Sequence, residues 1–234
     1  MRCGSWVSSD RIGRVADAPS DVLTREVEQL LLVDRPARDW AWRQRFFAAV
    51  GGAALVTDDP AVAGGPDGFG YTQFRLPPIG APYTAYSIDH LLVWSTDQGV
   101  GSVLRDRSGE VAWVFTFGNL WARLSAGSFD PSPAGDDQQP SVVGPEGEQV
   151  LFGSPSEGLF PPVARQVVRD ALLRLGVVDP MVGAVNRQSG HPAWSLALSL
   201  PADDAAAHRM TWYLPPQMGM LRIEVVPPEH RVPL

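Results

Sequence analysis

The residue types of a hydrolytic site stand closest together in the tetrapeptide Ser87-Ile88-Asp89-His90. A hydroxyl, a carboxylate and an imidazole form the proton relay of serine hydrolases, which usually take these groups from distant segments. Residues one to three positions apart at the start of a helix do not all face one point. The tetrapeptide is more typical of a helix start, where Ser87 caps the first turn and Asp89 interacts favourably with the helix dipole.

A second serine that could act as a nucleophile is Ser156, in the segment GSPSEG at 153–158. The segment follows a predicted strand and precedes a predicted helix, which is the setting of a nucleophile elbow. That elbow requires glycine two positions before the serine, and Ser154 occupies this position. The helix also begins later than an elbow allows, near Pro161, so we interpret the segment as a turn.

The sequence does not indicate a metal or cofactor site. The four histidines have no helical i, i+3 or i+4 spacing, and the single cysteine, Cys3, cannot build a cysteine-based zinc site. All 19 cationic residues are arginine, which excludes a P-loop and Schiff-base chemistry. The glycine-rich segment 64–70 precedes a strand, unlike a dinucleotide-binding loop. We therefore predict no catalytic residue, no bound metal and no cofactor.

Charge and hydropathy narrow the classes of partner. The chain of 234 residues carries a formal net charge of −7. A nucleic-acid surface needs clustered cations, so an acidic chain argues against that partner. No apolar run approaches the ~20 residues that span a bilayer, and residues 1–15 lack the apolar core of a signal peptide. We expect a cytoplasmic protein with neither a nucleic-acid nor a membrane partner.

The aromatic content is the most informative compositional feature, because the chain contains eight tryptophans. Exposed tryptophan is favoured at protein interfaces, where its large area and its N–H both contribute. Trp42 follows Trp40 by two positions, so one helix cannot bury both on the same side. Trp121 follows a predicted hairpin at a Gly-Asn turn. We predict Trp42 and Trp121 as interface residues, and core-facing positions for Trp40, Trp94, Trp113, Trp194 and Trp212.

The first half of the chain mixes helical and strand periodicity. Helices are predicted from Ser20 or Asp21 to Val33, from Pro36 to Gly51, and over 88–98. In the last of these, Leu91, Leu92 and Trp94 are expected to point inward, and Gly99 to end the helix. Strands are predicted at 53–57, 69–76, 100–105 and 111–117, with a loop at 58–68 and a turn at 117–121.

The second half begins after a segment rich in proline, glycine and aspartate at 128–148. Such a composition is typical of a linker or long loop. The predicted strands are 149–152, 181–185, 193–200 and 220–226, and the predicted helices start near Pro161 and near Asp203. The chain is thereby divided into a loose arm at 1–20, α+β subdomains at 21–127 and 149–234, and the linker at 128–148.

Both halves have the order helix, strand, strand, helix, strand, and the first half adds one more strand. We predict an α+β fold in which helices cover antiparallel sheets, without parallel crossovers, because the strands come in adjacent pairs. The two subdomains could share one continuous sheet. An internal duplication and a coincidence of common elements both explain the shared order.

In element order, each half resembles the compact modules of type III secretion chaperones and of some toxin-neutralising proteins. The resemblance rests on element order alone and transfers no functional residue. It implies a small, acidic, non-enzymatic protein that masks the surface of a partner.

The sequence therefore favours a non-enzymatic protein-binding module, such as a toxin-neutralising (immunity) or chaperone-like adaptor protein. Its partner would be another protein, and a basic one would be attracted by the negative charge. The alternative is a hydrolase whose acid and base come from distant segments, for which Asp89, His90 and Ser156 are the first residues to test. The sequence does not indicate an oligomeric state.

Overall fold

The computed structural model describes residues 18–129, 150–157, 160–187, 195–199, 205–214, 221–223 and 226–234. Within these ranges the helices and mixed sheets form an α+β fold, as predicted. Most of the predicted arm at 1–20, most of the predicted linker at 128–148, and Trp194 lie outside the described residues.

The chain begins with two helices, α1 (Asp21–Leu31) and α2 (Trp40–Val50), joined by the 3₁₀ turn η1 (Arg35–Ala37). The Ser20 hydroxyl caps α1 by accepting a hydrogen bond from the N–H of Leu23 (3.4 Å). The predicted helix from Pro36 is divided in two, because Asp39 starts a new helix by accepting from the N–H of Trp42 (2.8 Å).

The first sheet has the strand order β1-β2-β3-β4. Its elements are β1 (Val56–Gly64), β2 (Gly70–Arg75), α3 (Ile88–Gln98), β3 (Gly101–Arg105) and β4 (Val111–Phe115). β1 extends to Gly64, into the segment predicted as a loop. The β1–β2 register shifts between Thr57 and Val62, an irregularity that lets this edge strand contain Pro60, which has no N–H to donate.

The predicted turn at 117–121 is instead part of the helix α4 (Phe117–Ala126). A capping box starts it: the Thr116 hydroxyl accepts from the N–H of Asn119 (3.3 Å), and the Asn119 side-chain oxygen accepts from the N–H of Thr116 (2.9 Å). Asparagine at this position replaces the usual glutamate or glutamine, so the sequence signal for a helix start is weak.

The second sheet has the order β5-β6-β7-β8, and β9 also pairs with β6. The elements are β5 (Val150–Gly153), α5 (Pro162–Arg174), β6 (Met181–Arg187), β7 (Ser195–Leu198), α6 (Ala205–Tyr213), β8 (Leu221–Ile223), η3 (Pro228–His230) and β9 (Val232–Pro233). Within the described ranges the two sheets are separate rather than one continuous sheet.

Each sheet contains one parallel strand pair, β2–β3 in the first and β7–β8 in the second. The expectation that parallel crossovers are absent is wrong, because α3 and α6 each carry the chain back across the sheet before the next strand. The series α2-β1-β2-α3-β3 and α5-β6-β7-α6-β8 therefore agree in element order and in the directions of their strands.

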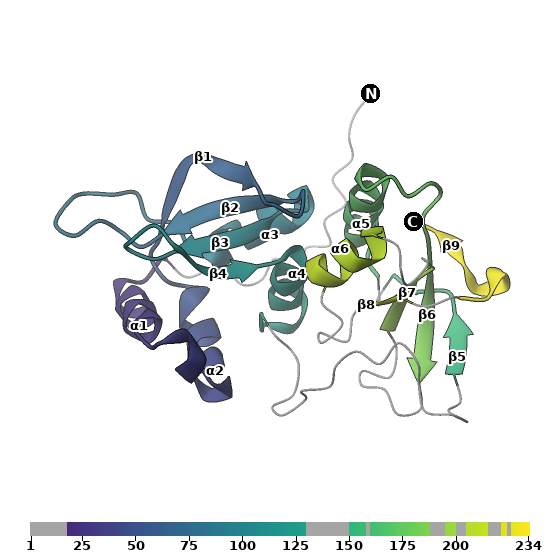
Figure 1. Cartoon of the computed structure of the whole chain (residues 1–234), viewed down its shortest axis with the longest axis horizontal. Helices are drawn as coiled ribbons and strands as arrows, with labels where there is room; N and C mark the ends of the chain where they lie inside the picture. Colours follow the sequence, from purple (N-terminus) through teal and green to yellow (C-terminus); the bar gives the residue numbers. More distant parts are fainter. Residues whose placement is uncertain are drawn as a thin grey trace.

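The two halves pack against one another through a shared hydrophobic core. Tyr213 of α6 stacks on Phe69 with ring centroids 3.7 Å apart, and its hydroxyl donates to the Gly99 carbonyl oxygen. Trp121 of α4 lies 5.8 Å from Phe160, also centroid to centroid. Figure 1 shows α4, α5 and α6 between the two sheets. A second core lies between the first sheet and α1 and α2.

Candidate binding surface

Local capping fixes both ends of α3, the helix that connects β2 to β3. The Ser87 hydroxyl accepts a hydrogen bond from the N–H of His90 (3.0 Å), which confirms the predicted N-cap. At the other end, Gly99 adopts the left-handed conformation with φ of 66°, as expected for a glycine that ends a helix. The helix is therefore placed precisely, together with the side chains on its outer face.

The outer face of α3 presents apolar side chains to solvent. Val93 is 58% exposed and Trp94 is 45% exposed. The expected inward position of Trp94 is wrong, because Leu92 faces the core and a residue two positions further lies about 200° around the helix. His90 and Asp97 are also exposed and lie on the same face.

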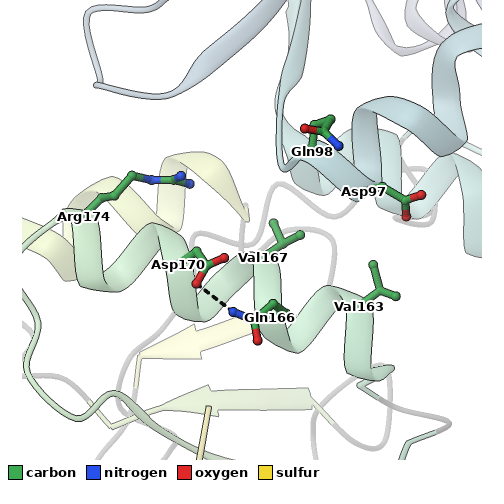
Figure 2. A pocket seen from close by; sticks show the side chains of 7 residues that line it. All are labelled: Asp97, Gln98, Val163, Gln166, Val167, Asp170 and Arg174. Atoms are coloured by element: carbon green, nitrogen blue, oxygen red, sulfur yellow. Dashed lines mark hydrogen bonds between the residues drawn. The ribbon is translucent and has the colours of Figure 1, made fainter. Parts of the chain in front are cut away.

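A shallow cleft of about 210 Å³ lies beside this face, between α3 and α5. Figure 2 shows the residues that line it: Asp97, Gln98, Val163, Gln166, Val167, Asp170 and Arg174. The Gln166 side-chain amide donates to the Asp170 carboxylate (2.8 Å), which holds that carboxylate in place. Val163, at one end of the cleft, is 55% exposed. We call the cleft and the exposed residues His90, Val93, Trp94 and Asp97 together the α3 surface.

The chemistry of the α3 surface suits a macromolecular partner better than a small ligand. Pockets for small molecules typically occupy about 300–1,000 Å³, whereas this cleft is smaller and has two carboxylates among its lining residues. Trp94 and Val93 offer apolar area on the same helix face as the carboxylate of Asp97, which lines the cleft together with Asp170. This combination can contact the apolar stem and the charged end of a basic side chain.

Trp42, predicted as an interface residue, lies instead in the core between α1 and α2. It is 6% exposed, and its indole N–H donates to the Leu30 carbonyl oxygen (2.8 Å). Its ring stacks on Phe46, with centroids 4.9 Å apart. Trp42, Phe46 and Val50 follow one another at four-residue spacing, so they share the buried face, and Trp40 lies partly outside it.

Trp121, the second predicted interface residue, is also buried, at 8% exposure. Its neighbours are Phe117, with ring centroids 6.0 Å apart, and Phe160 from the second half. The second half of the chain covers Trp121, as the core between α1 and α2 covers Trp42. Neither of these two tryptophans therefore offers an exposed indole to a partner. Trp94 does offer one.

The residues proposed for the hydrolase alternative lie in different settings. Both Asp89 carboxylate oxygens accept hydrogen bonds from Arg123, at 2.9 and 2.7 Å, and this contact raises the pKa of the Arg123 guanidinium. Asp89 thereby joins α3 to α4, whereas His90 is on the exposed face of α3. Ser156 is exposed in the second half, between β5 and α5. The Asp89 carboxylate is thus paired with Arg123, and His90 lies on the exposed face of the same helix.

Two further features of the described residues concern metal ions and membranes. Among the residues that the structure describes, no three histidine, cysteine, aspartate or glutamate side chains are grouped so that they could hold a metal ion. In the same parts of the chain, no helix has both the length and the hydrophobicity to cross a bilayer.

The α3 surface was missed in the sequence because it depends on tertiary structure. The cleft joins residues of the two halves, Asp97 and Asp170, whose proximity no local pattern indicates. The exposure of Trp94 could have been found, since Leu92 and Trp94 cannot both face inward on one helix.

No protein-family model matches this sequence, and neither a curated protein nor a solved structure is significantly similar to it. A proposal for function therefore depends on the geometry and chemistry of the chain itself.

Proposed function

We propose that the protein is a non-enzymatic, intracellular protein-binding module, of the toxin-neutralising or chaperone-like adaptor kind, which binds its partner through the α3 surface. The observation that carries this proposal is the exposure of Trp94 and Val93 side by side on α3, next to a cleft lined by two carboxylates. Tryptophan is among the residues most enriched at the centres of protein interfaces.

The charge of the chain supports a basic partner. Asp97 and Asp170 give the cleft two carboxylates, against the single cation of Arg174. The whole chain has a formal net charge of −7, which attracts a cationic protein over a distance of about a Debye length, ~8 Å at physiological salt. The apolar contact at Trp94 would contribute most of the affinity, and the carboxylates would contribute orientation and association rate.

The proposal is tested with the full chain as bait in its native host, and by co-expression with the products of neighbouring genes. A retained protein is identified, purified and titrated against the wild type and Trp94→Ala. We expect Trp94→Ala to weaken binding about tenfold or more, as for a hot-spot residue. Asp97→Asn should lower the association rate and its dependence on salt.

The control is Leu124→Ala on α4, because Leu124 is 46% exposed and Trp94 45%. This variant loses an equally exposed apolar side chain that does not line the cleft. Equal affinity of the wild type and Trp94→Ala for the identified partner would contradict the proposal, and so would equal weakening by Leu124→Ala.

A further inference from the structure

The described part of the chain begins beside the helix that carries the α3 surface. The Ser20 N–H donates to the Gly52 carbonyl oxygen (2.9 Å), and the neighbouring Gly51 carbonyl oxygen accepts from the N–H of Asp89 (2.9 Å). Asp89 is in the first turn of α3. Residues 1–17, which lie outside the described residues, are therefore attached to the molecule next to the start of this helix.

The sequence of residues 1–15, MRCGSWVSSDRIGRV, differs in charge from the rest of the chain. It contains three arginines and a single acidic residue, whereas the whole chain has a formal net charge of −7. Apolar side chains lie between and beside these arginines: Trp6, Val7, Ile12 and Val15. We call residues 1–15 the N-terminal segment. Its side chains are basic and apolar.

The α3 surface offers the complementary groups. Its exposed apolar side chains are Val93 and Trp94. Figure 2 shows the carboxylates of the cleft on two different helices, Asp97 on α3 and Asp170 on α5, with Arg174 at the far end of α5 from Val163. An arginine in this cleft can pair with a carboxylate while its stem and its apolar neighbours cover the exposed side chains of α3.

The N-terminal segment is long enough to reach the cleft. Between Asp89 and Asp97 the helix advances only about 12 Å, at ~1.5 Å per residue. The chain from Arg11 to Ser20 spans up to about 30 Å when extended, at ~3.3 Å per residue. The arginines of the segment therefore come within reach of both carboxylates.

Attachment to the same chain favours this contact. A tethered segment has an effective concentration in the millimolar range at a site that it can reach. A contact with a dissociation constant as weak as about 1 mM is then formed in about half of the molecules. A few arginine–carboxylate and apolar contacts are sufficient for such an affinity.

Charge distinguishes this segment from the other long one that lies outside the described residues. Residues 130–149 contain five acidic residues and no arginine. The two carboxylates of the cleft would repel a segment of this composition. Of the two segments, the charge therefore favours residues 1–15.

We propose that the N-terminal segment binds to the α3 surface of the same chain. Arg11 and Arg14 pair with the carboxylates of the cleft, and the apolar side chains of the segment cover Trp94. The regulatory consequence rests on the function proposed above: the segment occupies the surface that binds a basic partner, so the partner has to displace it.

The test uses the full chain, whose only cysteine, Cys3, is in the segment. A nitroxide spin label on Cys3 weakens the NMR signals of nuclei that come close to it. In protein with isotope-labelled tryptophan, the indole N–H signal of Trp94 is assigned by its absence from Trp94→Phe. This signal should lose about half of its intensity or more, relative to the same protein with the label reduced.

The loss of intensity should depend on the carboxylates of the cleft. It should disappear in the double variant of Asp97→Asn and Asp170→Asn, and it should shrink at about 1 M salt, where the Debye length is about 3 Å. A full Trp94 signal in the spin-labelled wild type would overturn the proposal, and so would a loss that persists in this double variant. A loss of equal size in a mixture of spin-labelled and isotope-labelled copies would place the contact between two copies and also overturn it.

A matched pair of variants tests the arginines. The double variant of Arg11→Ser and Arg14→Ser should restore the Trp94 signal. The control is the double variant of Arg25→Ser and Arg43→Ser, which makes the same change in charge at exposed positions of α1 and α2 and should retain the loss of intensity. Equal behaviour of the two double variants would contradict the proposal.

The partner found for the α3 surface then separates this proposal from the proposed function. The variant without Arg11 and Arg14 should bind that partner about twofold more tightly, or more, than the control variant, because the surface is no longer occupied. A weakened Trp94 signal with unchanged partner affinity in Trp94→Ala would contradict the proposed function and support the intramolecular contact. Weaker partner binding by Trp94→Ala together with a full Trp94 signal would support the proposed function and overturn this contact.

Discussion

At the scale of single residues, the first sheet contains two buried hydroxyl groups that lack a hydrogen-bond partner among the described residues. Thr72 and Ser102 are each 1% exposed and are paired across the parallel strands β2 and β3. Neither side-chain oxygen has a hydrogen-bond partner within the described chain. A buried polar group without a partner costs about 1–3 kcal/mol, so these two hydroxyls lower the stability of the sheet.

We predict that Thr72→Val, which replaces the hydroxyl by a methyl group of similar size, leaves the free energy of unfolding unchanged or raises it by about 1 kcal/mol. Urea denaturation measures this change. The matched control is Thr24→Val, because the Thr24 hydroxyl is also buried but donates to the Ala54 carbonyl oxygen (2.9 Å). Thr24→Val should lower stability by about 1 kcal/mol. A loss in Thr72→Val as large as that in Thr24→Val would contradict the assignment.

At the scale of elements, an ion pair links α1 to the β3–β4 turn. Arg107 donates to both carboxylate oxygens of Glu28, one of them at 3.0 Å, and also holds the Pro77 carbonyl of the β2–α3 loop. The hydrogen bond from Arg107 lowers the pKa of Glu28 below its ordinary value of 4.5. The contact therefore stabilises the folded state only while Glu28 is ionised.

The pH dependence follows from the direction of this shift. A carboxyl group whose pKa is lower in the folded state adds stability above its unfolded pKa, and this stability is lost as the pH falls through the folded pKa. Urea denaturation over a pH series should show Glu28→Gln less stable than the wild type at neutral pH. The difference should shrink as the pH falls below about 4.5.

The control for this prediction is Glu26→Gln, since Glu26 pairs with Arg45 at a longer distance, 3.4 Å, and in a more exposed position. Exposed ion pairs contribute about 0–1 kcal/mol, so this variant should remain close to the wild type throughout. A constant difference between the wild type and Glu28→Gln over the whole pH series would show that the ion pair is not its cause.

Some features of these elements could be predicted from the sequence, and others could not. The caps of α3 at Ser87 and Gly99 were predictable, because capping depends on a residue and its near neighbours. The α4 cap at Thr116 was missed, since Asn119 is not the usual partner of a capping box. The α3 surface and the attachment of the β2–α3 loop depend on contacts such as Tyr83 with Asp21, 62 residues apart in the chain, which no local pattern encodes.

At the scale of the whole molecule, the two halves agree in strand directions but do not contribute equally to their junction. The first half contributes α4, β3 and the start of β2 to the shared core, and the second half contributes α5, α6, β6 and β7. Gly99, which ends α3, also contacts the second half. It packs closely against this half, because a Cβ at this position would approach Val167 of α5 to 2.8 Å. The end of α3, and with it one wall of the cleft, is therefore fixed by the second half.

Tyr213 is the residue through which this dependence can be measured. It is fully buried, it stacks on Phe69 and lies 5.3 Å from the Phe117 ring, and it donates a hydrogen bond to Gly99. Burial also raises its pKa, so the hydroxyl stays protonated and remains a donor.

We predict that Tyr213→Ala lowers the free energy of unfolding by about 3–5 kcal/mol, and that Tyr213→Phe lowers it by about 1 kcal/mol. Far-ultraviolet circular dichroism and tryptophan fluorescence, followed during the same urea titration, should show one coincident transition for each protein. Because strands of the first sheet and α4 are all part of the shared core, the loss should appear in both signals together. Separate transitions, with the first half retaining its wild-type midpoint in Tyr213→Ala, would show that the halves fold independently and that the second half does not fix the end of α3.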